Sequence, residues 1–407
     1  LTVTSVTIIF ERICTFVVKF GFCKISMDNL NQKIGILGGG QLGKMLLQAG
    51  SILDFDIRIM EQDADCPAAS LTSKFHKGKI TDYQDVVAFG EDCDIVTIEI
   101  ENVNIQALVQ LESSGKKVYP SSFSLGIIKD KGNQKTFYQT NNLPTSKFKF
   151  FDGASEIVEA LSNEELSFPF VQKSRTEGYD GKGVQVINTW DDLQKLFDTT
   201  SVVEDLVDID KEIAVIIARR PSGQIVAFPP VEMHFHKEAN LVDYLFSPSS
   251  LTQAQEEEAT KLAKTIGEKL EIIGLLAVEL FLTKSGEILI NEVAPRPHNS
   301  GHHSIEACNI SQYEMHLRAL CDLPLLSPKL TKSAVMLNIL GSPGYSGPVI
   351  YEGLEECLTT DGVHVHIYGK KETKPFRKLG HVTIAADTVQ EAIDKAQFVK
   401  STLKAIS

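Results

Sequence analysis

The sequence predicts an α/β (α+β) protein with a parallel α/β domain first, a larger mixed domain next and a small β-rich domain last. An aliphatic strand at Lys33–Leu37 leads into a glycine turn and a helical run, which is how parallel βαβ units begin. Two apolar runs, Leu275–Thr283 and Glu287–Val293, flank a short turn and predict a hairpin. From about Pro328, strand-like segments dominate. The 407 residues, 43% of them hydrophobic, are enough for two or three domains with their own cores.

The composition excludes some classes of partner. Lys plus Arg number 40 against 53 Asp plus Glu, and the net charge of −13 argues against a general binder of nucleic acid or of anionic membranes. The seven cysteines show no zinc-like or C-x-x-C spacing, so we expect free thiols in a reducing cytoplasm. No apolar run reaches about 18 residues, so no transmembrane helix is expected.

Residues 1–26 form an apolar stretch that Glu11, Arg12 and Lys19 interrupt. The stretch lacks the basic start and the small-residue cleavage site of a signal peptide. We interpret it as a non-native upstream extension, with Met27 as the natural start. The alternative is a genuine targeting or membrane-touching segment, and N-terminal sequencing of natively expressed protein distinguishes the two.

The glycine turn after the first strand overlaps two nucleotide-binding motifs. Gly38–Gly43 matches the dinucleotide fingerprint, and Glu61 stands where a ribose-binding acid would follow. The same turn nearly matches a Walker A loop, but Met45 replaces the Ser or Thr that would reach magnesium. The simpler alternative is a turn that lets strand and helix pack closely. Because helix N-terminal amides attract anions, a phosphate or carboxylate would also suit this turn.

The first domain is expected to span residues 27–125. Its later strands are predicted at Asp56–Met60, Asp94–Glu99 and Val118–Pro120. Glu99 and Glu101 end one of these strands, where ligands meet open α/β sheets. An ordinary solvated strand end would show the same pattern.

A lysine-bearing strand and a glycine-rich loop characterise the middle domain. Ile127–Thr140 reads as one helical segment that carries Lys131, and Phe168–Lys173 predicts a strand that ends in a lysine. The following loop, Ser174–Gly183, contains three glycines, and its exposed amides suit phosphate groups. The alternative is a plain hairpin loop, which the neighbouring lysines disfavour.

Two acids, Glu279 and Glu292, lie inside the apolar strands of the predicted hairpin. A carboxylate there is costly unless a cation or a donor meets it. Paired strands lie about 5 Å apart, so both carboxylates can face one ion. One or two carboxylates completed by substrate phosphates is how magnesium is held at nucleotide sites. The alternative is two acids on a solvated face.

Five basic residues occur within Lys370–Lys378, against the acidic balance of the chain. A solvated hairpin turn is the usual meaning of such a charge run. A phosphate-binding segment is the alternative, because an arginine can hold phosphate through two parallel hydrogen bonds.

Together these motifs resemble those of the ATP-grasp enzymes and, more narrowly, of the 5-(carboxyamino)imidazole ribonucleotide synthase family. The resemblance runs from about Lys33 to His381. It is carried by Gly38–Met45, Thr97–Val103, Gly178–Gly183, Asn291–His302 and Arg377–His381. It implies a Rossmann-like pre-ATP-grasp domain at 27–125, an ATP-grasp domain at 126–322 with a lid subdomain at about 145–205, and a small C-terminal β-rich domain at 323–407.

The resemblance implies an ATP-dependent carboxylation in purine (IMP) biosynthesis. ATP, bicarbonate and 5-aminoimidazole ribonucleotide would give the 5-carboxyamino derivative, ADP and phosphate through carboxyphosphate. Magnesium, or manganese in its place, would accompany ATP. A cytoplasmic homodimer with small-molecule substrates, and with no nucleic acid or membrane partner, is expected.

The resemblance also implies roles for individual residues. The metal ligands would be Glu279 and Glu292. The ATP-binding set would be Lys131, Lys173, Gly178, Tyr179, Asp180, Gly181, Lys182, Gly183, Glu204, Asp205, Leu206, Val207, Glu212, Asn291 and Glu292. The ribonucleotide would meet Gln41, Leu42, Tyr179, His298, Asn299, Ser300, Lys371, Arg377 and Lys378. The catalytic residues would be Asp180, Arg296 and Lys371. The segment Pro229–His236 departs from the family pattern, so no ligand role is assigned to His234 or His236.

Three alternatives remain at this stage. A related ATP-grasp ligase, such as the formate-dependent glycinamide ribonucleotide transformylase, would share the lid and the two acids. An NAD-dependent dehydrogenase would use Gly38–Gly43 and Glu61 but would leave the constellation at 274–303 unexplained. A non-catalytic nucleotide-binding regulator would keep the lid and lose the metal acids, which are both present.

Overall fold

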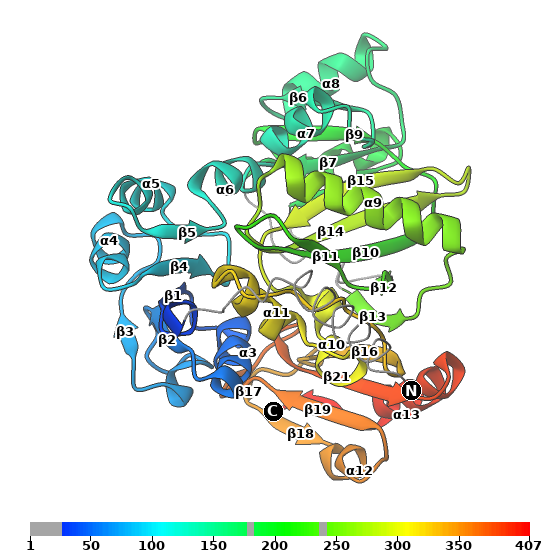
Figure 1. Cartoon of the computed structure of the whole chain (residues 1–407). Helices are drawn as coiled ribbons and strands as arrows, with labels where there is room; N and C mark the ends of the chain where they lie inside the picture. The colour runs from blue at the N-terminus through cyan, green and yellow to red at the C-terminus, as the bar shows by residue number, and fades with distance from the viewer. Residues whose placement is uncertain (1–26, 177–182, 236–241) are drawn as a thin grey trace, which may run out of the picture.

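The computed structural model describes residues 27–176, 183–235 and 242–407 and confirms the predicted α/β class (Figure 1). The proposed N-terminal extension, residues 1–26, lies outside the described residues. A short helix, α2 (Met27–Leu30), begins the described chain. Among the described helices, none is long and apolar enough to cross a membrane.

The first domain is a parallel sheet with helices on both faces. Its strand order is β3-β2-β1-β4-β5, formed by β1 (Lys33–Leu37), β2 (Asp56–Glu61), β3 (Phe75–Lys77), β4 (Ile95–Ile98) and β5 (Lys117–Tyr119). α3 (Gln41–Gly50) packs on one face, and α4 (Tyr83–Glu91) and α5 (Ile105–Ser113) pack on the other. The aliphatic runs of β1 and β4 are buried, as expected for parallel strands covered on both sides. Two 3₁₀ turns, η1 (Ser51–Leu53) and η2 (Ala69–Leu71), complete this domain.

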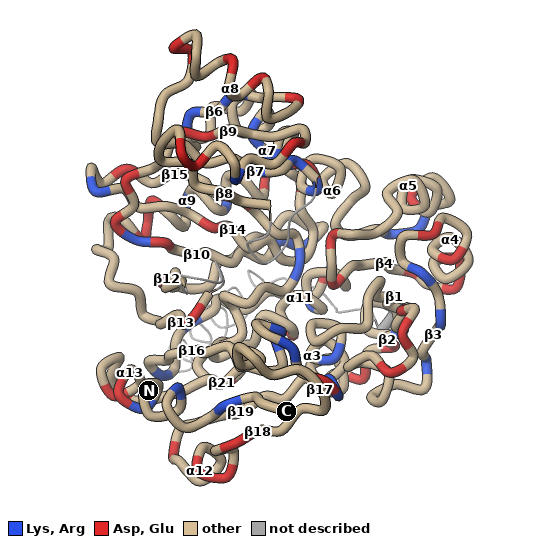
Figure 2. The backbone as a smooth tube through the Cα atoms, turned by 180° about the vertical axis from the view of Figure 1, so that it is seen from behind, with Lys and Arg blue, Asp and Glu red and all other residues tan. Residues whose placement is uncertain are grey.

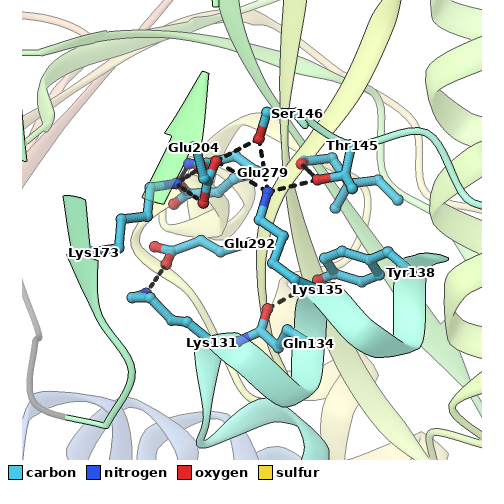
Figure 3. Close-up of polar contacts among 12 residues, drawn as sticks. Lys131, Gln134, Lys135, Tyr138, Thr145, Ser146, Lys173, Glu204, Glu279 and Glu292 are labelled. Carbon is cyan, nitrogen blue, oxygen red and sulfur yellow. Dashed lines mark hydrogen bonds and ion pairs between the residues drawn. The ribbon is translucent and has the colours of Figure 1, made fainter. Parts of the chain in front are cut away.

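The predicted single helix Ile127–Thr140 is wrong, because the chain forms two helices there. α6 (Ser122–Ile128) ends before α7 (Lys131–Thr140) begins. Asp130 separates them as the N-cap of α7, and its carboxylate accepts from the main-chain N–H groups of Gly132 and Asn133. A short acidic side chain satisfies N-terminal amides better than it continues a helix. Lys131, the first residue of α7, points toward Glu292 (Figure 3).

The segment after α7 forms a small antiparallel sheet in the order β6-β9-β7-β8. The strands are β6 (Phe148–Phe151), β7 (Phe170–Ser174), β8 (Val184–Ile187) and β9 (Ser201–Asp205). α8 (Ala154–Ser162) and the 3₁₀ helix η3 (Trp190–Lys195) cover it, and Phe170 lies at the centre of their shared core.

The largest sheet runs through the middle and the end of the chain in the order β15-β14-β10-β12-β13-β16-β21-β19, with β11 beside β10. Its first part consists of β10 (Ile209–Arg219), β11 (Ile225–Ala227), β12 (Val231–Phe235), β13 (Val242–Ser247), β14 (Gly274–Thr283) and β15 (Ile288–Ala294). α9 (Gln253–Lys269) covers one face, and α11 (Gln312–Leu320) covers the other. The predicted hairpin is confirmed, because β14 and β15 pair antiparallel. η4 (Asn299–Gly301) and α10 (Ser304–Ala307) lie between β15 and α11.

The same sheet continues into the C-terminal part, because β13 pairs with β16 (Ser333–Leu340). β21 (Lys378–Ala386) and β19 (Val363–Ile367) extend it further. Smaller pairs join β17 (Gly347–Pro348) to β20 (Glu372–Thr373) and β18 (Ile350–Glu352) to β22 (Lys404–Ile406).

The C-terminal part is less purely β than the sequence predicted. Besides the short α12 (Leu354–Leu358), it contains α13 (Val389–Thr402), which packs on β16 and β21 through Ala392, Ala396 and Val399. Small residues carry this contact, so the apolar stripe of the helix is weak in the sequence. Acidic and basic residues are interspersed over the described chain, as the rear view shows (Figure 2).

Candidate active site

Glu279 and Glu292 lie opposite each other in the β14–β15 ladder, as the sequence predicted for a hairpin. Burial raises the pKa of Glu279, and the charge of Glu292 raises it further. Lys131 holds the pKa of Glu292 well below its ordinary value, because its Nζ lies 2.5 Å from Glu292 Oε2. Asn291 Nδ2 lies 3.5 Å from Glu279 Oε2. The hairpin thus concentrates negative charge that one lysine only partly offsets.

This donor set fits a divalent cation that binds oxygen. Two carboxylates face the same space, and burial, followed by the charge of Glu292, raises the pKa of Glu279. In the described part of the chain, no group of three or more His, Cys, Asp or Glu side chains could hold a metal. A magnesium ion, which is held by one or two carboxylates with phosphates and water completing the shell, matches this incomplete set.

Two lysines and a glutamate form a buried network beside the acid pair (Figure 3). Lys173 Nζ lies 3.0 Å from Glu204 Oε1 and 2.9 Å from Asn291 Oδ1. Lys135 Nζ lies 3.0 Å from Glu204 Oε2 and donates to the hydroxyls of Thr145 and Ser146. Residues of α7, β7, β9 and β15 thus line one small pocket.

The network keeps Glu204 ionised. Burial alone would raise the pKa of Glu204, but Lys173 and Lys135, with the Ser146 hydroxyl, hold it at about 2. Burial lowers the pKa of Lys135 to about 8 in spite of Glu204. The sequence reasoning missed Lys135, although its position four residues after Lys131 places both lysines on one helix face.

The glycine turn of the first domain is filled by the protein's own acids. The carboxylate of Glu99 accepts from Gly40 N at 2.5 Å and from Gly43 N at 2.6 Å, and Glu61 accepts from Gly39 N at 3.2 Å. A Cβ added at Gly40 would lie 2.5 Å from Glu99 Oε1. The carboxyl group of Glu99 therefore occupies this helix N-terminus, and a dinucleotide pyrophosphate would have to displace it. The dehydrogenase alternative loses its main support.

The predicted ribonucleotide residues near this turn have different surroundings. The side chain of Leu42 lies in the core of the first domain, while Gln41 is half-buried at the start of α3. The predicted role of Leu42 would therefore fall to its main chain.

The segment after β15 connects the first domain to the hairpin. Arg296 Nε lies 2.8 Å from Glu101 Oε1, and His298 Nε2 lies 3.5 Å from Glu279 Oε1. His298 Nδ1 lies 2.9 Å from the buried Ser300 hydroxyl. The structure thus brings His298 beside the acid pair, with Ser300 against its ring, whereas Arg296 pairs with Glu101 of the first domain.

The members of the predicted ATP-binding set from Glu204 to Glu212 are spread along β9, the β9–β10 connection and β10. Glu204 faces the two lysines, whereas Asp205 and Leu206 are exposed and Val207 is half-buried. Glu212 lies on β10, and burial raises its pKa to about 7. Of the predicted lid loop, Gly178, Tyr179, Asp180, Gly181 and Lys182 lie outside the described residues. Gly183 is described, has φ +76° and accepts from Ser174 N.

The basic segment 370–378 faces the first domain. Lys371 Nζ lies 2.9 Å from Asp65 Oδ1, with both side chains exposed. The loop that carries Asp65 packs on the glycine turn, because Ala68 N donates to Gly39 O. Arg377 Nη1 donates to Glu372 O, and Lys378 begins β21. Lys371 therefore lies across the interface from the loop that packs on the glycine turn, whereas the bond of Arg377 stays within its own segment.

Three family models match the chain in succession. They describe a ribonucleotide synthetase preATP-grasp domain over residues 31–129, an ATP-grasp domain over 136–313, and a phosphoribosylaminoimidazole carboxylase C-terminal domain over 334–395. The three predicted parts of the fold are thereby confirmed.

Relatives of known name are similar over most of the chain. A chloroplastic phosphoribosylaminoimidazole carboxylase of Vigna aconitifolia is 37% identical over 88% of this chain and 64% of its own length. The chain thus spans about two thirds of that relative. An N5-carboxyaminoimidazole ribonucleotide synthase of Synechococcus elongatus is 33% identical over 92% of this chain and 95% of its own.

Solved structures show the same similarity. N5-carboxyaminoimidazole ribonucleotide synthetase from Thermotoga maritima is 38% identical, has a TM-score of 0.85, and is matched over 92% of this chain and 99% of its own. A structure from Aspergillus clavatus, described as a complex with ADP and 5-aminoimidazole ribonucleotide, is 29% identical with a TM-score of 0.84, over 92% and 98% of the two chains.

Proposed function

Because the chain belongs to the N5-carboxyaminoimidazole ribonucleotide synthase family, we propose that it carboxylates 5-aminoimidazole ribonucleotide with ATP and bicarbonate. The product would be the 5-carboxyamino derivative, and the chain would act as a C–N bond-forming ligase of purine biosynthesis. The single observation that carries the proposal is the acid pair Glu279 and Glu292, with Lys131 bound to Glu292 and His298 beside Glu279.

The reaction needs an activated form of bicarbonate. An oxygen of bicarbonate attacks the γ-phosphorus of ATP, the bond to ADP breaks, and carboxyphosphate forms. The exocyclic amine of the ribonucleotide then attacks the carboxyl carbon, inorganic phosphate leaves, and the amine loses a proton. Phosphoryl transfer depends on positioning and on charge stabilisation more than on covalent help from the protein.

The described residues suit the first step. Lys131 and Lys173 would bind the phosphates of ATP, since both ammonium groups lie beside the acid pair at the ends of long side chains. Glu279 and Glu292 would hold Mg²⁺ or Mn²⁺, which supplies charge neutralisation when bound, and Asn291 of the same hairpin contacts both Lys173 and Glu279. Arg296 would stabilise carboxyphosphate, and Asp180 is proposed to take the proton of the amine.

The ribonucleotide is proposed to bind between the glycine turn and the basic segment. Lys371, Arg377 and Lys378 lie on the C-terminal side of this interface, and Gln41 lies on the other. The positive charge of the segment suits a 5′-phosphate, whose charge the acid-rich hairpin would repel.

The Arg377→Ala variant is expected to weaken use of the ribonucleotide by about 1.5–3 kcal/mol, roughly ten- to a hundredfold, because a charge-assisted phosphate contact is lost. ATP binding should be nearly unchanged. Separate titrations of each substrate measure this. Lys374→Ala, an exposed basic residue of the same segment, is the matched control. Equal losses for ATP and ribonucleotide, or no loss for either, would indicate that the segment is an ordinary surface turn without a role in binding the ribonucleotide.

The proposed function is tested by ADP release from ATP and bicarbonate, with and without 5-aminoimidazole ribonucleotide. Stimulation by the ribonucleotide, with formation of the carboxyamino product, is the expected result. Turnover with formate and glycinamide ribonucleotide instead would identify the transformylase reaction. Absence of both activities in the folded, nucleotide-binding protein would contradict the assignment.

Three further expectations are retained as proposals. We propose a homodimer, which sedimentation of the purified protein tests. We propose a cytoplasmic location, which agrees with the free cysteines of the described chain. We also propose domain limits at 125/126 and 322/323, to be tested by limited proteolysis.

A further inference from the structure

We propose that Gln312 is a positioning residue for the segment Arg296–His298. The inference rests on the proposed function, because it assigns to Gln312 the task of holding the residues that meet bicarbonate and carboxyphosphate. Gln312 would not touch substrate itself. It lies in the first turn of α11, fully buried below the segment.

The side-chain amide of Gln312 binds both main-chain polar groups of His298. His298 N donates to Gln312 Oε1 at 2.9 Å, and Gln312 Nε2 donates to His298 O at 2.7 Å. The second N–H of the amide faces His302 Nδ1 at 3.2 Å, where the Tyr313 hydroxyl also lies at 2.8 Å. The pair of bonds to the main chain of His298, one accepted by Oε1 and one donated by Nε2, determines the orientation of the amide.

The position of Gln312 is itself fixed from several sides. Its main-chain N donates to Ser304 Oγ at 2.9 Å, and Ser304 Oγ donates to Gly301 O. A Cβ at Gly301 would lie 2.5 Å from Gln312 Oε1 and 2.5 Å from Ile216 Cδ1. Glycine at 301 therefore leaves the room in which the amide sits, between η4 and β10.

Holding His298 by its main chain determines where two functional side chains point. The ring of His298 reaches Glu279 at 3.5 Å, and Arg296, two residues earlier, reaches Glu101 at 2.8 Å. Neither contact includes Gln312, so the amide acts on them through the backbone alone. A shift of about 1 Å at such a position can lower turnover about a hundredfold.

The polarity of the amide allows a sharp test. An ionised glutamate at this position keeps the shape but offers only acceptors, so it cannot donate to His298 O. A protonated glutamic acid regains one donor and one acceptor. The groups that face the position are His298, His302 and Tyr313, and β10 presents apolar Ile216. Burial lowers the pKa of His302 well below its ordinary value, so its ring stays neutral over the range in which the glutamate would titrate.

The experiment compares Gln312→Glu and Gln312→Met with Gln224→Glu. Gln224 is the matched control, because its amide makes the same pair of bonds with the main chain of Leu325, far from the acid pair in the chain. ADP affinity, ribonucleotide-dependent kcat and the KM for bicarbonate are measured for each protein between pH 6 and pH 8.5.

Both Gln312 variants are expected to lose about ten- to a hundredfold in kcat while binding ADP within about twofold of wild type. The kcat of Gln312→Glu, divided by that of wild type, should rise as the pH falls. Gln224→Glu should retain wild-type kcat. Wild-type kcat in Gln312→Glu, a ratio independent of pH, or a parallel loss of ADP binding in both Gln312 variants would each overturn the positioning role. Absence of turnover in wild type would instead contradict the proposed function, and this inference with it.

Discussion

The Glu292→Gln variant is expected to lose at least about a hundredfold in kcat while remaining folded. Glu292 is paired with Glu279 across the hairpin and would share a cation with it. Glutamine keeps the shape but removes the charge, and charge stabilisation by a bound metal is worth several kcal/mol in a transition state. Turnover at saturating and at limiting magnesium measures the loss.

The fold should survive because the substitution also removes a repulsion. Glu292 is one of the causes that raise the pKa of Glu279, so its neutralisation relieves Glu279 while leaving Lys131 at the edge of the pocket. Glu287→Gln is the control, since Glu287 is exposed at the turn of the same hairpin. Normal turnover of Glu292→Gln at limiting magnesium would refute the metal assignment.

The Glu204→Gln variant is expected to lose about 3–5 kcal/mol of unfolding free energy, because it leaves two buried ammonium groups without their carboxylate. The side chains of Glu204 and Lys135 are only 4% and 3% exposed, so solvent cannot replace the lost partner. Urea unfolding measures the change. Glu391→Gln, which breaks the exposed pair with Lys395, should cost less than about 1 kcal/mol. Similar effects for both variants would show that the network contributes no more than a surface pair.

The loss of unfolding free energy in Glu204→Gln should also depend on pH. The folded pKa of Glu204 is lowered to about 2, so its stabilisation is present above its ordinary value and disappears as the pH falls through about 2. The pKa of Lys135 is lowered to about 8 even with Glu204, and it should fall further without it. Below pH 8 the folded variant then binds fewer protons than folded wild type. The difference in unfolding free energy between the two proteins therefore shrinks as the pH rises from about 6 to 8. An equal deficit at pH 6 and pH 8 would contradict the role of Lys135.

Much of the fold could be read from local patterns. The strand, glycine turn and helix at Lys33–Gly50, and the hairpin with Glu279 opposite Glu292, follow from apolar runs and turn residues whose meaning is local. The break at Asp130 was missed, since an acidic residue can either lie within a helix or cap one. The ion pair of Asp130 with Arg175, a tertiary contact that the sequence does not show, distinguishes the capping role from the helical one.

The missed parts of the site depend on residues distant in the chain. Glu99 fills the glycine turn from the end of a strand more than fifty residues later, and Gln312 holds His298 from α11, beyond η4 and α10. Lys135 gains its role only when β9 brings Glu204 beside it. A single sequence offers no signal for such pairings, because each residue by itself is ordinary for its helix or strand.

The pairing of β13 with β16 makes the middle and the end of the chain one continuous backbone ladder. Rotation of these two parts against each other would break hydrogen bonds in the interior of a sheet, so this junction cannot serve as a hinge. The two parts should also melt together rather than as separate cooperative units. The C-terminal part is thus no removable module: cutting the chain before Ser333 would leave the edge of β13 with unpaired N–H and C=O groups, the kind of edge that recruits other chains.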